Sequence, residues 1–278
     1  MSQFVEVASE IARGAGAIVE EIGRKRRELA SKAFGLKGEF DLVTEADHAS
    51  EAYIVEQLHA RFPSHSVVAE EGGGQRIGGD YRWYVDPVDG TTNFAHGFPV
   101  YNVTLALERA GEVIAGVIFD PTRNEMFTAE RGAGAWLNGD RIAVSSVATI
   151  EESLVATGFP SRRRHQNVNV HFYYQLAMLS HGVRRAGAAA IDLAYVACGR
   201  LDAFWEFGLN PWDMAAGSLM VEEAGGRMST MRGESHQLTS RETLATNGKL
   251  HPPMLELFAE IFGGRFRFPM VQIGPERA

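Results

Sequence analysis

The chain has 278 residues, of which 45% are hydrophobic and 22% are charged, as is typical of a folded globular protein, so a largely disordered chain is excluded. The net charge of −8 repels nucleic-acid backbones and anionic membranes. No apolar run reaches the roughly 20 residues that a membrane-spanning helix needs, so we expect neither a membrane partner nor direct contact with nucleic acid.

The first half of the chain predicts two helices followed by a run of strands. Apolar residues recur every three to four positions from Val5 to Ile22, which predicts an amphipathic helix. A second helix is expected from Thr44 to Arg61. In Asn102–Glu108 the residues alternate between two faces, as in a half-buried antiparallel strand. The strands expected here are Ser66–Ala69, Arg82–Val85, Val100–Glu108, Val113–Asp120 and Glu125–Thr128.

Beyond residue 148 strands and helices alternate, which predicts crossover connections and a partly parallel sheet. The expected strands are Leu154–Thr157, Asp202–Phe207 and short segments near Met228 and Leu244. The expected helices are His171–Leu179, Ala188–Cys198, Pro211–Glu223 and Pro253–Phe262. We therefore predict an α/β (α+β) fold with mixed sheets and two lobes, residues 1–148 and 149–278. The segment after Gly263 has no periodicity and is either an ordered extension or a frayed end.

Carboxylates are concentrated in four short segments, and each segment has a purely structural interpretation. Thr44 and Asp47 fit a capping box at a helix start, and Asn210 and Asp213 fit the same pattern with Pro211 between them. Glu70 and Glu71 at a strand end could be solvated, and the sequence Asp86-Pro-x-Asp89-Gly could be a turn. The segments are Asp41–Asp47, Val67–Glu71, Trp83–Phe94 and Asn210–Asp213.

Taken together, the four segments favour a metal-assisted phosphate site. Asp86 follows an expected strand, and Pro87 should block continuation of its ladder, so that the chain turns and Asp86 and Asp89 converge. Gly90 allows close backbone approach, and a helical turn that starts at Thr91 offers free N–H groups to a phosphate. Carboxylates next to a phosphate would repel it unless cations intervene, and clustered hard oxygen ligands select Mg²⁺.

Two long motifs are similar to those of the inositol monophosphatase family. They are Trp83-x-Val-Asp-Pro-x-Asp-Gly-Thr-x-Asn-Phe94 and Trp212-Asp-x-Ala-Ala-Gly217, followed by Glu223-Ala-Gly-Gly226. The pair Glu70-Glu71 also matches, and the segments Lys37–Asp41 and Arg184–Arg200 resemble the bacterial branch. The resemblance implies a layered αβαβα sandwich of the sugar-phosphatase type, usually dimeric, with Mg²⁺-dependent and often lithium-sensitive hydrolysis of phosphomonoesters.

The resemblance also implies a role for each matching position. Glu70, Asp86 and the carbonyl of Val88 would bind a first Mg²⁺. Asp86, Asp89 and Asp213 would bind a second, and a third, weaker ion would use Glu70 and waters. Asp47 and Thr91 would activate the attacking water, assisted by Glu70. The residues expected at the substrate are Glu70, Val88, Asp89, Gly90, Thr91, Gly187, Ala188, Ala189, Glu206 and Asp213.

The sequence leaves the substrate open. An inositol monophosphate is the first expectation, and fructose 1,6-bisphosphate, histidinol phosphate and nucleotide 3′-phosphates are the alternatives. Relatives often carry Thr or Ser where this chain has Ala188, so one polar contact to the substrate is expected to be absent. A regulatory protein of the transcription machinery is the competing class, although the retained acids favour an enzyme. The basic cluster Arg162–His165 is either solvated or steers anionic substrates.

The remaining expectations concern surroundings and assembly. Cys198 is the single cysteine, so an internal disulfide is excluded and a reducing, cytoplasmic location is expected. It lies on the apolar face of an expected helix and should pack in the core. His96 is interpreted as a packing residue. The family resemblance implies a homodimer.

Overall fold

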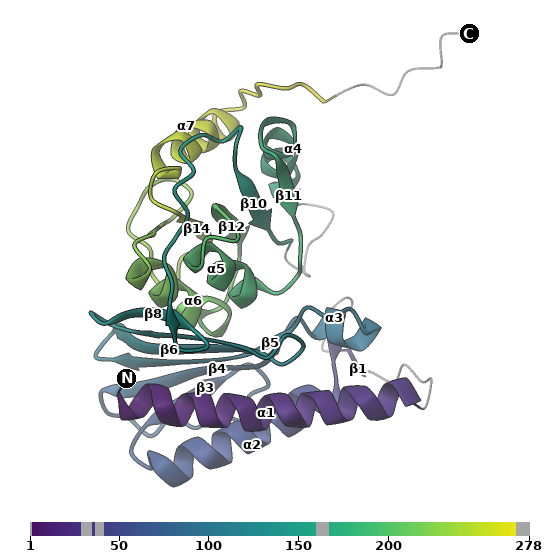
Figure 1. Ribbon diagram of the computed structural model, residues 1–278, viewed down its shortest axis with the longest axis vertical. Helices are drawn as coiled ribbons and strands as arrows, with labels where there is room; N and C mark the ends of the chain where they lie inside the picture. Colours follow the sequence, from purple (N-terminus) through teal and green to yellow (C-terminus); the bar gives the residue numbers. More distant parts are fainter. Residues whose placement is uncertain (1, 29–34, 37–41, 160–166, 271–278) are drawn as a thin grey trace.

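The protein is a stack of helices and sheets in the order αβαβα (Figure 1). A computed structural model describes residues 2–28, 35–36, 42–159 and 167–270. Helices α1 and α2 cover the outer face of one sheet, and α5 and α6 lie between the two sheets. Helices α4 and α7 cover the outer face of the second sheet. None of the helices in the described ranges is long and apolar enough to cross a membrane.

The helices form where the apolar periodicity predicted them. Helix α1 buries Val5, Ala8 and Ile11 against the first sheet, and α6 has the predicted bounds. The short α3 starts at Thr91, as expected for a helical turn at that position. The described helices are α1 (Gln3–Glu28), α2 (Glu45–Arg61), α3 (Thr91–His96), α4 (Asn169–Leu179), α5 (Ala189–Ala197), α6 (Pro211–Glu223) and α7 (His251–Phe262).

The described part of the chain forms a large sheet in which β3 runs parallel to β4 and the other neighbours are antiparallel. In spatial order it contains β3 (Ser66–Ala69), β4 (Tyr81–Asp89), β5 (Asn102–Arg109), β6 (Glu112–Asp120), β7 (Glu125–Glu130), β8 (Gly134–Leu137) and β9 (Asp140–Arg141). The prediction of a half-buried strand at 102–108 was wrong. Helices cover both faces of this sheet, so β5 is buried on both sides up to Leu107.

The expected block of the ladder at Pro87 is confirmed in part: pairing is interrupted between Asp86 and Asp89, but β4 continues to Asp89. The strand passes Pro87 through a bulge between Asp86 and Asp89, and pairing resumes where Asp89 faces Asn102. A bulge tolerates a residue without an N–H group. The carbonyl of Pro87 accepts a hydrogen bond from Ser50 Oγ of α2 at 3.0 Å, which holds the bulge against the helix layer.

The second sheet is mixed, as the alternation of strands and helices predicted. Strand β10 pairs in parallel with β11 and β12, whereas β14 pairs antiparallel with β12 and β13. In spatial order it contains β11 (Gly182–Arg184), β10 (Leu154–Thr157), β12 (Ala203–Phe207), β14 (Glu242–Thr246) and β13 (Arg227–Ser229). A separate antiparallel pair is formed by β1 (Gly35–Leu36) and β2 (Leu42–Val43).

The two sheets share one core around α5 and α6. Ile118 and Phe127 of the large sheet belong to the same apolar cluster as Ala156 and Phe204 of the second sheet. The large sheet ends at residue 141 and the second begins at residue 154. The division of the chain at residue 148 stays a prediction.

Residues 264–270 form an ordered extension along α4, called the strap below. Up to residue 270, the segment after Gly263 is therefore an ordered extension and not a frayed end. The side-chain amide of Gln175 donates to the carbonyl of Phe268 at 2.6 Å and accepts from the Phe268 N–H at 2.9 Å. Arg267 forms two hydrogen bonds with Glu260 of α7 at 2.8 and 2.9 Å. The strap therefore ties α4 to α7.

Candidate active site

The site is formed where β4 ends and α3 begins. Gly90 has a φ of 97°, which favours glycine, and a side chain there would also lie 2.8 Å from the carbonyl oxygen of Val100. Glycine is thus required for the chain to turn directly from Asp89 into α3. This turn places Thr91 next to the first turn of α2.

Asp47 both caps α2 and holds Thr91. Its Oδ2 accepts from the Thr44 N–H at 2.9 Å, and the predicted capping box is confirmed. Its Oδ1 accepts from Thr91 Oγ1 at 2.8 Å, and the same hydroxyl lies 3.0 Å from the carbonyl oxygen of Val88. The structural and the functional interpretation of Asp47 are therefore compatible, because each uses a different oxygen. Asp47 is fully buried, so water does not compete for these hydrogen bonds.

Four carboxylates converge next to this pair. Burial raises the pKa of Asp86 well above its usual value, and the nearby charges of Glu70, Asp89 and Asp213 raise it further. Burial also raises the pKa of Asp89, and it raises the pKa of Asp213 to about 8. The four acids come from β4, from the N-terminus of α6 and from the segment after β3. The structure thus brings together the acidic residues that the sequence nominated.

This donor set suits a hard divalent cation. Glu70 lies close enough to Asp86 for its charge to raise the pKa of Asp86, after the larger effect of burial. A cation at this position would offset the mutual repulsion of the acids. Within the described ranges, no three Asp, Glu, His or Cys side chains are already arranged as a ligand group. The available ligands are all oxygens, as Mg²⁺ prefers.

Asp89 connects the large sheet to helix α5. Its carboxylate accepts from Asn102 Nδ2 at 2.8 Å, from the Ala189 N–H at 3.2 Å and from the Ala190 N–H at 2.8 Å. Ala188, the N-cap residue of α5, has no capping side chain, and Asp89 at the end of β4 takes over that role. The residues expected to face the alcohol, 187–189, therefore lie next to a proposed metal ligand.

The other expected alcohol contact, Glu206, is buried on β12. Burial raises its pKa well above the usual value, and the charges of Asp192 and Asp213 add to this. Gly158 packs so closely against it that any side chain at residue 158 would overlap the carboxylate. Glu206 is therefore held in place by close packing.

Several residues of this region were missed in the sequence. Asn93 donates to the carbonyls of Val100 at 2.7 Å and Ala186 at 2.8 Å, which joins α3 to the segment before α5. Asp192 is buried on α5, and burial followed by the charge of Asp89 raises its pKa well above its usual value. The sequence signal that could have identified Asn93 and Asp192 is a polar residue within an otherwise apolar segment. Lys37, Asp41 and the Arg162–His165 cluster lie outside the described residues.

Comparison with known proteins shows the family of the chain. The family model described as the inositol monophosphatase family matches residues 1–262. The chain belongs to the inositol monophosphatase family. The match ends where α7 ends, so the strap at 264–270 lies beyond the region that the family model covers.

Relatives within the inositol monophosphatase family have two kinds of name. The Nus factor SuhB of Pseudomonas aeruginosa is 44% identical over 261 residues, which cover 92% of this chain and 95% of that protein. The inositol-1-monophosphatase of Synechocystis sp. is 43% identical over 262 residues, which cover 93% of this chain and 90% of that protein. The two names correspond to the two classes of function that the sequence left open.

Solved structures of the family confirm the predicted αβαβα sandwich. The extragenic suppressor protein suhB from Bartonella henselae superposes with a TM-score of 0.86 and 37% identity, covering 92% of this chain and 98% of that chain. Inositol monophosphatase from Anabaena sp. superposes with a TM-score of 0.81 and 39% identity, covering 91% of this chain and 94% of that chain.

Proposed function

We propose that this protein is a Mg²⁺-dependent phosphomonoesterase that hydrolyses a small polyol phosphate, with inositol monophosphate as the first substrate. The observation that carries the proposal is the Thr91–Asp47 hydrogen bond, 2.8 Å long, beside the carboxylate cluster of Glu70, Asp86, Asp89 and Asp213. A proton acceptor and a hard-cation site thus adjoin each other. A homodimer in the cytoplasm and sensitivity to lithium complete the proposal.

The ligands divide between two or three ions as the family resemblance implies. Glu70, Asp86 and the Val88 carbonyl hold the first ion, and Asp86, Asp89 and Asp213 hold the second. A third, weaker ion relies on Glu70 and waters. When bound, Mg²⁺ supplies charge neutralisation of the phosphate, a bound water of lowered pKa and stabilisation of the leaving alkoxide.

The chain itself moves a proton and orients the phosphate. The Thr91 hydroxyl donates to Asp47, so its lone pairs accept a hydrogen bond from the attacking water. The water proton can then pass through Thr91 to Asp47, which acts as the general base. The Gly90 and Thr91 amides at the start of α3 receive the phosphate oxygens. Gly187, Ala188, Ala189 and Glu206 face the alcohol.

The test is phosphate release with Mg²⁺ from a panel of inositol 1-phosphate, fructose 1,6-bisphosphate, histidinol phosphate and adenosine 3′-phosphate. We expect the highest kcat/KM for inositol 1-phosphate. Asp86→Asn should remove nearly all turnover, because Asp86 is the ligand that both ions share. Substantial activity of Asp86→Asn at saturating Mg²⁺ would refute the assignment of Asp86 as a metal ligand. If the wild-type protein released no phosphate from any ester of the panel, the proposed phosphatase activity would be refuted.

A second function is favoured by the relative named Nus factor SuhB, which is 44% identical to this chain. We propose it as a role in addition to catalysis, through contact with the transcription machinery. The test is co-purification of RNA polymerase with the tagged protein from its own cells. Equal recovery with Asp86→Asn would show that such a role is independent of catalysis, and no recovery with either protein would exclude it.

A further inference from the structure

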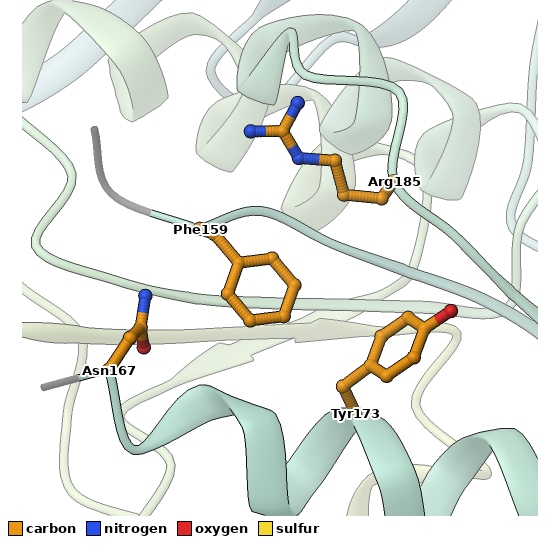
Figure 2. Close-up of a pocket in the computed structure, with 4 residues that line it drawn as sticks. All are labelled: Phe159, Asn167, Tyr173 and Arg185. Atoms are coloured by element: carbon orange, nitrogen blue, oxygen red, sulfur yellow. The ribbon is translucent and has the colours of Figure 1, made fainter. Parts of the chain in front are cut away.

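Helix α2 holds the candidate site from the outer face of the large sheet, away from the pocket beside α4 that Figure 2 shows. Three of its buried side chains, Asp47, Ser50 and Glu51, share one helix face because they are three and four residues apart. Asp47 binds the hydroxyl of Thr91, and Ser50 binds the carbonyl of Pro87 in the bulge of β4. The proposed mechanism gives no role to Glu51.

Glu51 reaches the segment that follows β3. Its Oε2 accepts from the Glu71 N–H at 2.7 Å, and its Oε1 accepts from the Gly73 N–H at 2.7 Å. These distances are typical of hydrogen bonds to an ionised carboxylate, which are stronger than those between neutral groups. Glu51 is only 4% exposed, so water hardly competes for them. One carboxylate therefore fastens the main chain on both sides of Gly72.

The segment that Glu51 fastens is a turn back toward β3. Gly72 has a φ of 88°, and its N–H donates to the carbonyl of Ala69 at 3.3 Å. The returning chain lies against β3, because the Val67 N–H donates to the carbonyl of Gln75 at 2.7 Å. A side chain at Gly74 would lie 2.5 Å from the Val67 carbonyl oxygen. A run of three glycines loses much conformational entropy when it is ordered, and the two hydrogen bonds to Glu51 offset this cost.

The turn carries the proposed metal ligand Glu70. The Glu70 N–H donates to the carbonyl of Val85 in β4 at 3.2 Å, and the next N–H along the chain, that of Glu71, donates to Glu51. The main chain of Glu70 is thus held by β4 on one side and by α2 on the other. Its charge acts on Asp86, so its carboxylate lies near the other acids. A displacement of the turn would therefore move Glu70 relative to Asp86.

We propose that Glu51 is a positioning residue, which holds Glu70 at the metal site and so presets the spacing of the ligands before a cation binds. This inference rests on the metal site of the proposed function and deepens it. Without a cation, repulsion from the neighbouring acids drives Glu70 outward, and the bonds from Glu51 oppose that movement. Groups that orient metal ligands typically change metal affinity by about 10- to 100-fold when they are removed.

Glu51→Asp is the decisive variant. Aspartate keeps the negative charge, but it is one carbon shorter and cannot reach both N–H groups. We expect the affinity for Mn²⁺, which accepts the same oxygen ligands and is measured by electron paramagnetic resonance, to fall by about tenfold or more. An unchanged Mn²⁺ affinity would overturn the inference. If Glu51→Gln weakens binding and Glu51→Asp does not, Glu51 acts through its charge alone, and the inference is likewise overturned.

Activity gives a second signature. In Glu51→Asp the Mg²⁺ concentration for half-maximal phosphate release should rise by about tenfold, while kcat at saturating Mg²⁺ stays within about threefold of wild type. A variant that is merely unfolded in part would lower kcat and leave the Mg²⁺ requirement unchanged. That result in Glu51→Asp would reduce Glu51 to a purely structural role.

Hydrogen exchange tests the positioning without metal or substrate. In EDTA, the amides of Glu71 and Gly73 should exchange faster in Glu51→Asp by about tenfold or more, because both lose their acceptor. The amide of Leu105 in the buried strand β5 is the internal reference and should keep its rate. Wild-type exchange at residues 71 and 73 in the variant would show that Glu51 does not hold the turn.

Gly73→Ala tests the same contact from the side of the turn and leaves α2 unaltered. A side chain at residue 73 would lie 2.7 Å from Glu51 Oε1, so it displaces the carboxylate and should weaken Mn²⁺ binding as Glu51→Asp does. Wild-type affinity in Gly73→Ala would contradict the inference.

Glu56→Asp is the matched control, since it makes the same chemical change at an exposed position of α2. We expect its Mn²⁺ affinity and Mg²⁺ requirement to stay within about twofold of wild type. If Glu56→Asp weakens Mn²⁺ binding as much as Glu51→Asp does, the effect comes from α2 in general and the inference fails.

The metal and exchange measurements separate this inference from the proposed function. If no ester is hydrolysed but Mn²⁺ affinity and amide exchange follow the expected pattern, the proposed phosphatase activity fails and the role of Glu51 stands. If esters are hydrolysed and Glu51→Asp equals wild type in both measurements, the role of Glu51 fails and the proposed function stands.

Discussion

Helices α2 and α6 begin with the same local arrangement. In α2, Asp47 Oδ2 accepts from the N–H of Thr44 at 2.9 Å, and in α6, Asp213 Oδ2 accepts from the N–H of Asn210 at 2.7 Å. The surroundings of the two acids differ. Asp47 has a second oxygen bound by the hydroxyl of Thr91, whereas burial and the charges of Asp89 and Glu70 raise the pKa of Asp213 to about 8.

The comparison shows that a capping box positions a carboxylate without deciding its chemistry. The cap uses one carboxylate oxygen, which accepts from the N–H of the N-cap residue and so holds the acid at the helix N-terminus. In the proposed mechanism, whatever faces the other oxygen sets its role: the hydroxyl of Thr91 would make Asp47 a proton acceptor, and the neighbouring acids would make Asp213 a cation ligand. Changes that affect the two acids differently therefore test the proposed assignment of roles.

Among the variants that test this comparison, Asp47→Asn is expected to have the largest effect. An amide has one oxygen, so it cannot accept from both Thr44 and Thr91, and the proton acceptor is lost. We expect kcat to fall by about 10³-fold at saturating Mg²⁺, within the usual range for a general base. Steady-state kinetics check this, with circular dichroism to confirm folding. A kcat within threefold of wild type would exclude Asp47 as the base.

Thr91→Ala removes the hydroxyl that, in the proposed mechanism, passes the water proton to Asp47, and it should lower kcat by about 10²-fold. Thr91→Ser keeps the hydroxyl and is the matched control, for which we expect most of the activity to return. Both variants are assayed at the same Mg²⁺ concentration. If the alanine and serine variants have equal kcat, the hydroxyl is not part of the proton path.

Asp213→Asn should change the pH dependence of stability in the metal-free protein. The pKa of Asp213 is raised to about 8 in the folded state, so the folded protein keeps a proton that the unfolded chain loses above its usual carboxyl pKa. The wild-type unfolding free energy should therefore fall as pH rises toward 8, by about 1–3 kcal/mol from this group. Asp213→Asn should flatten that fall.

Urea unfolding in EDTA between pH 5 and pH 8 measures this difference. Asp213→Asn should also raise the Mg²⁺ concentration required for half-maximal activity, because one ligand charge is lost. An identical pH slope in the two proteins would show that Asp213 is ionised in the folded state without metal.

The smallest effect concerns α7, which begins with His251 and has no acid in its first turn. His251 is fully buried, its Nδ1 lies 3.0 Å from Thr246 Oγ1, and burial lowers its pKa to about 4. The unfolded chain binds a proton below about pH 6.5 and the folded protein does not, so stability falls as pH drops from 6.5 toward 4.

We expect His251 to account for a loss of about 1 kcal/mol between pH 7 and pH 5. His251→Asn, which keeps a polar group toward Thr246, should show a correspondingly shallower decline in chemical unfolding. A decline of the same depth in both proteins would mean that His251 is protonated in the folded state at pH 5.

Local patterns in the sequence predicted most elements and the acidic site. The periodicity of α1 and the Pro211–Glu223 pattern of α6 identify helices directly, and the capping residues mark their starts. The edge strand β11 (Gly182–Arg184) was missed because three residues show no periodicity. The continuation of β4 beyond Pro87 was not predicted, because the bulge depends on pairing with β5, which is not local.

The rest of the site could not be predicted, because its residues depend on partners that are distant in the sequence. Nothing near Asp89 indicates that it caps α5, since the Ala190 N–H that it accepts from lies 101 residues away. Asp192 and Asn93 are isolated polar residues whose importance depends on Asp89 and Ala186, each supplied by a different part of the fold. Such relationships follow from tertiary packing.

The contact of Asp89 with α5 has a consequence for recombining members of the family. A chimera joined between the two sheets would place Asp89 from one parent against α5 from the other. Because Asp89 binds main-chain N–H groups of Ala189 and Ala190, the junction does not require matching side chains at those two positions. Parental halves with quite different α5 surfaces should therefore remain interchangeable at this point.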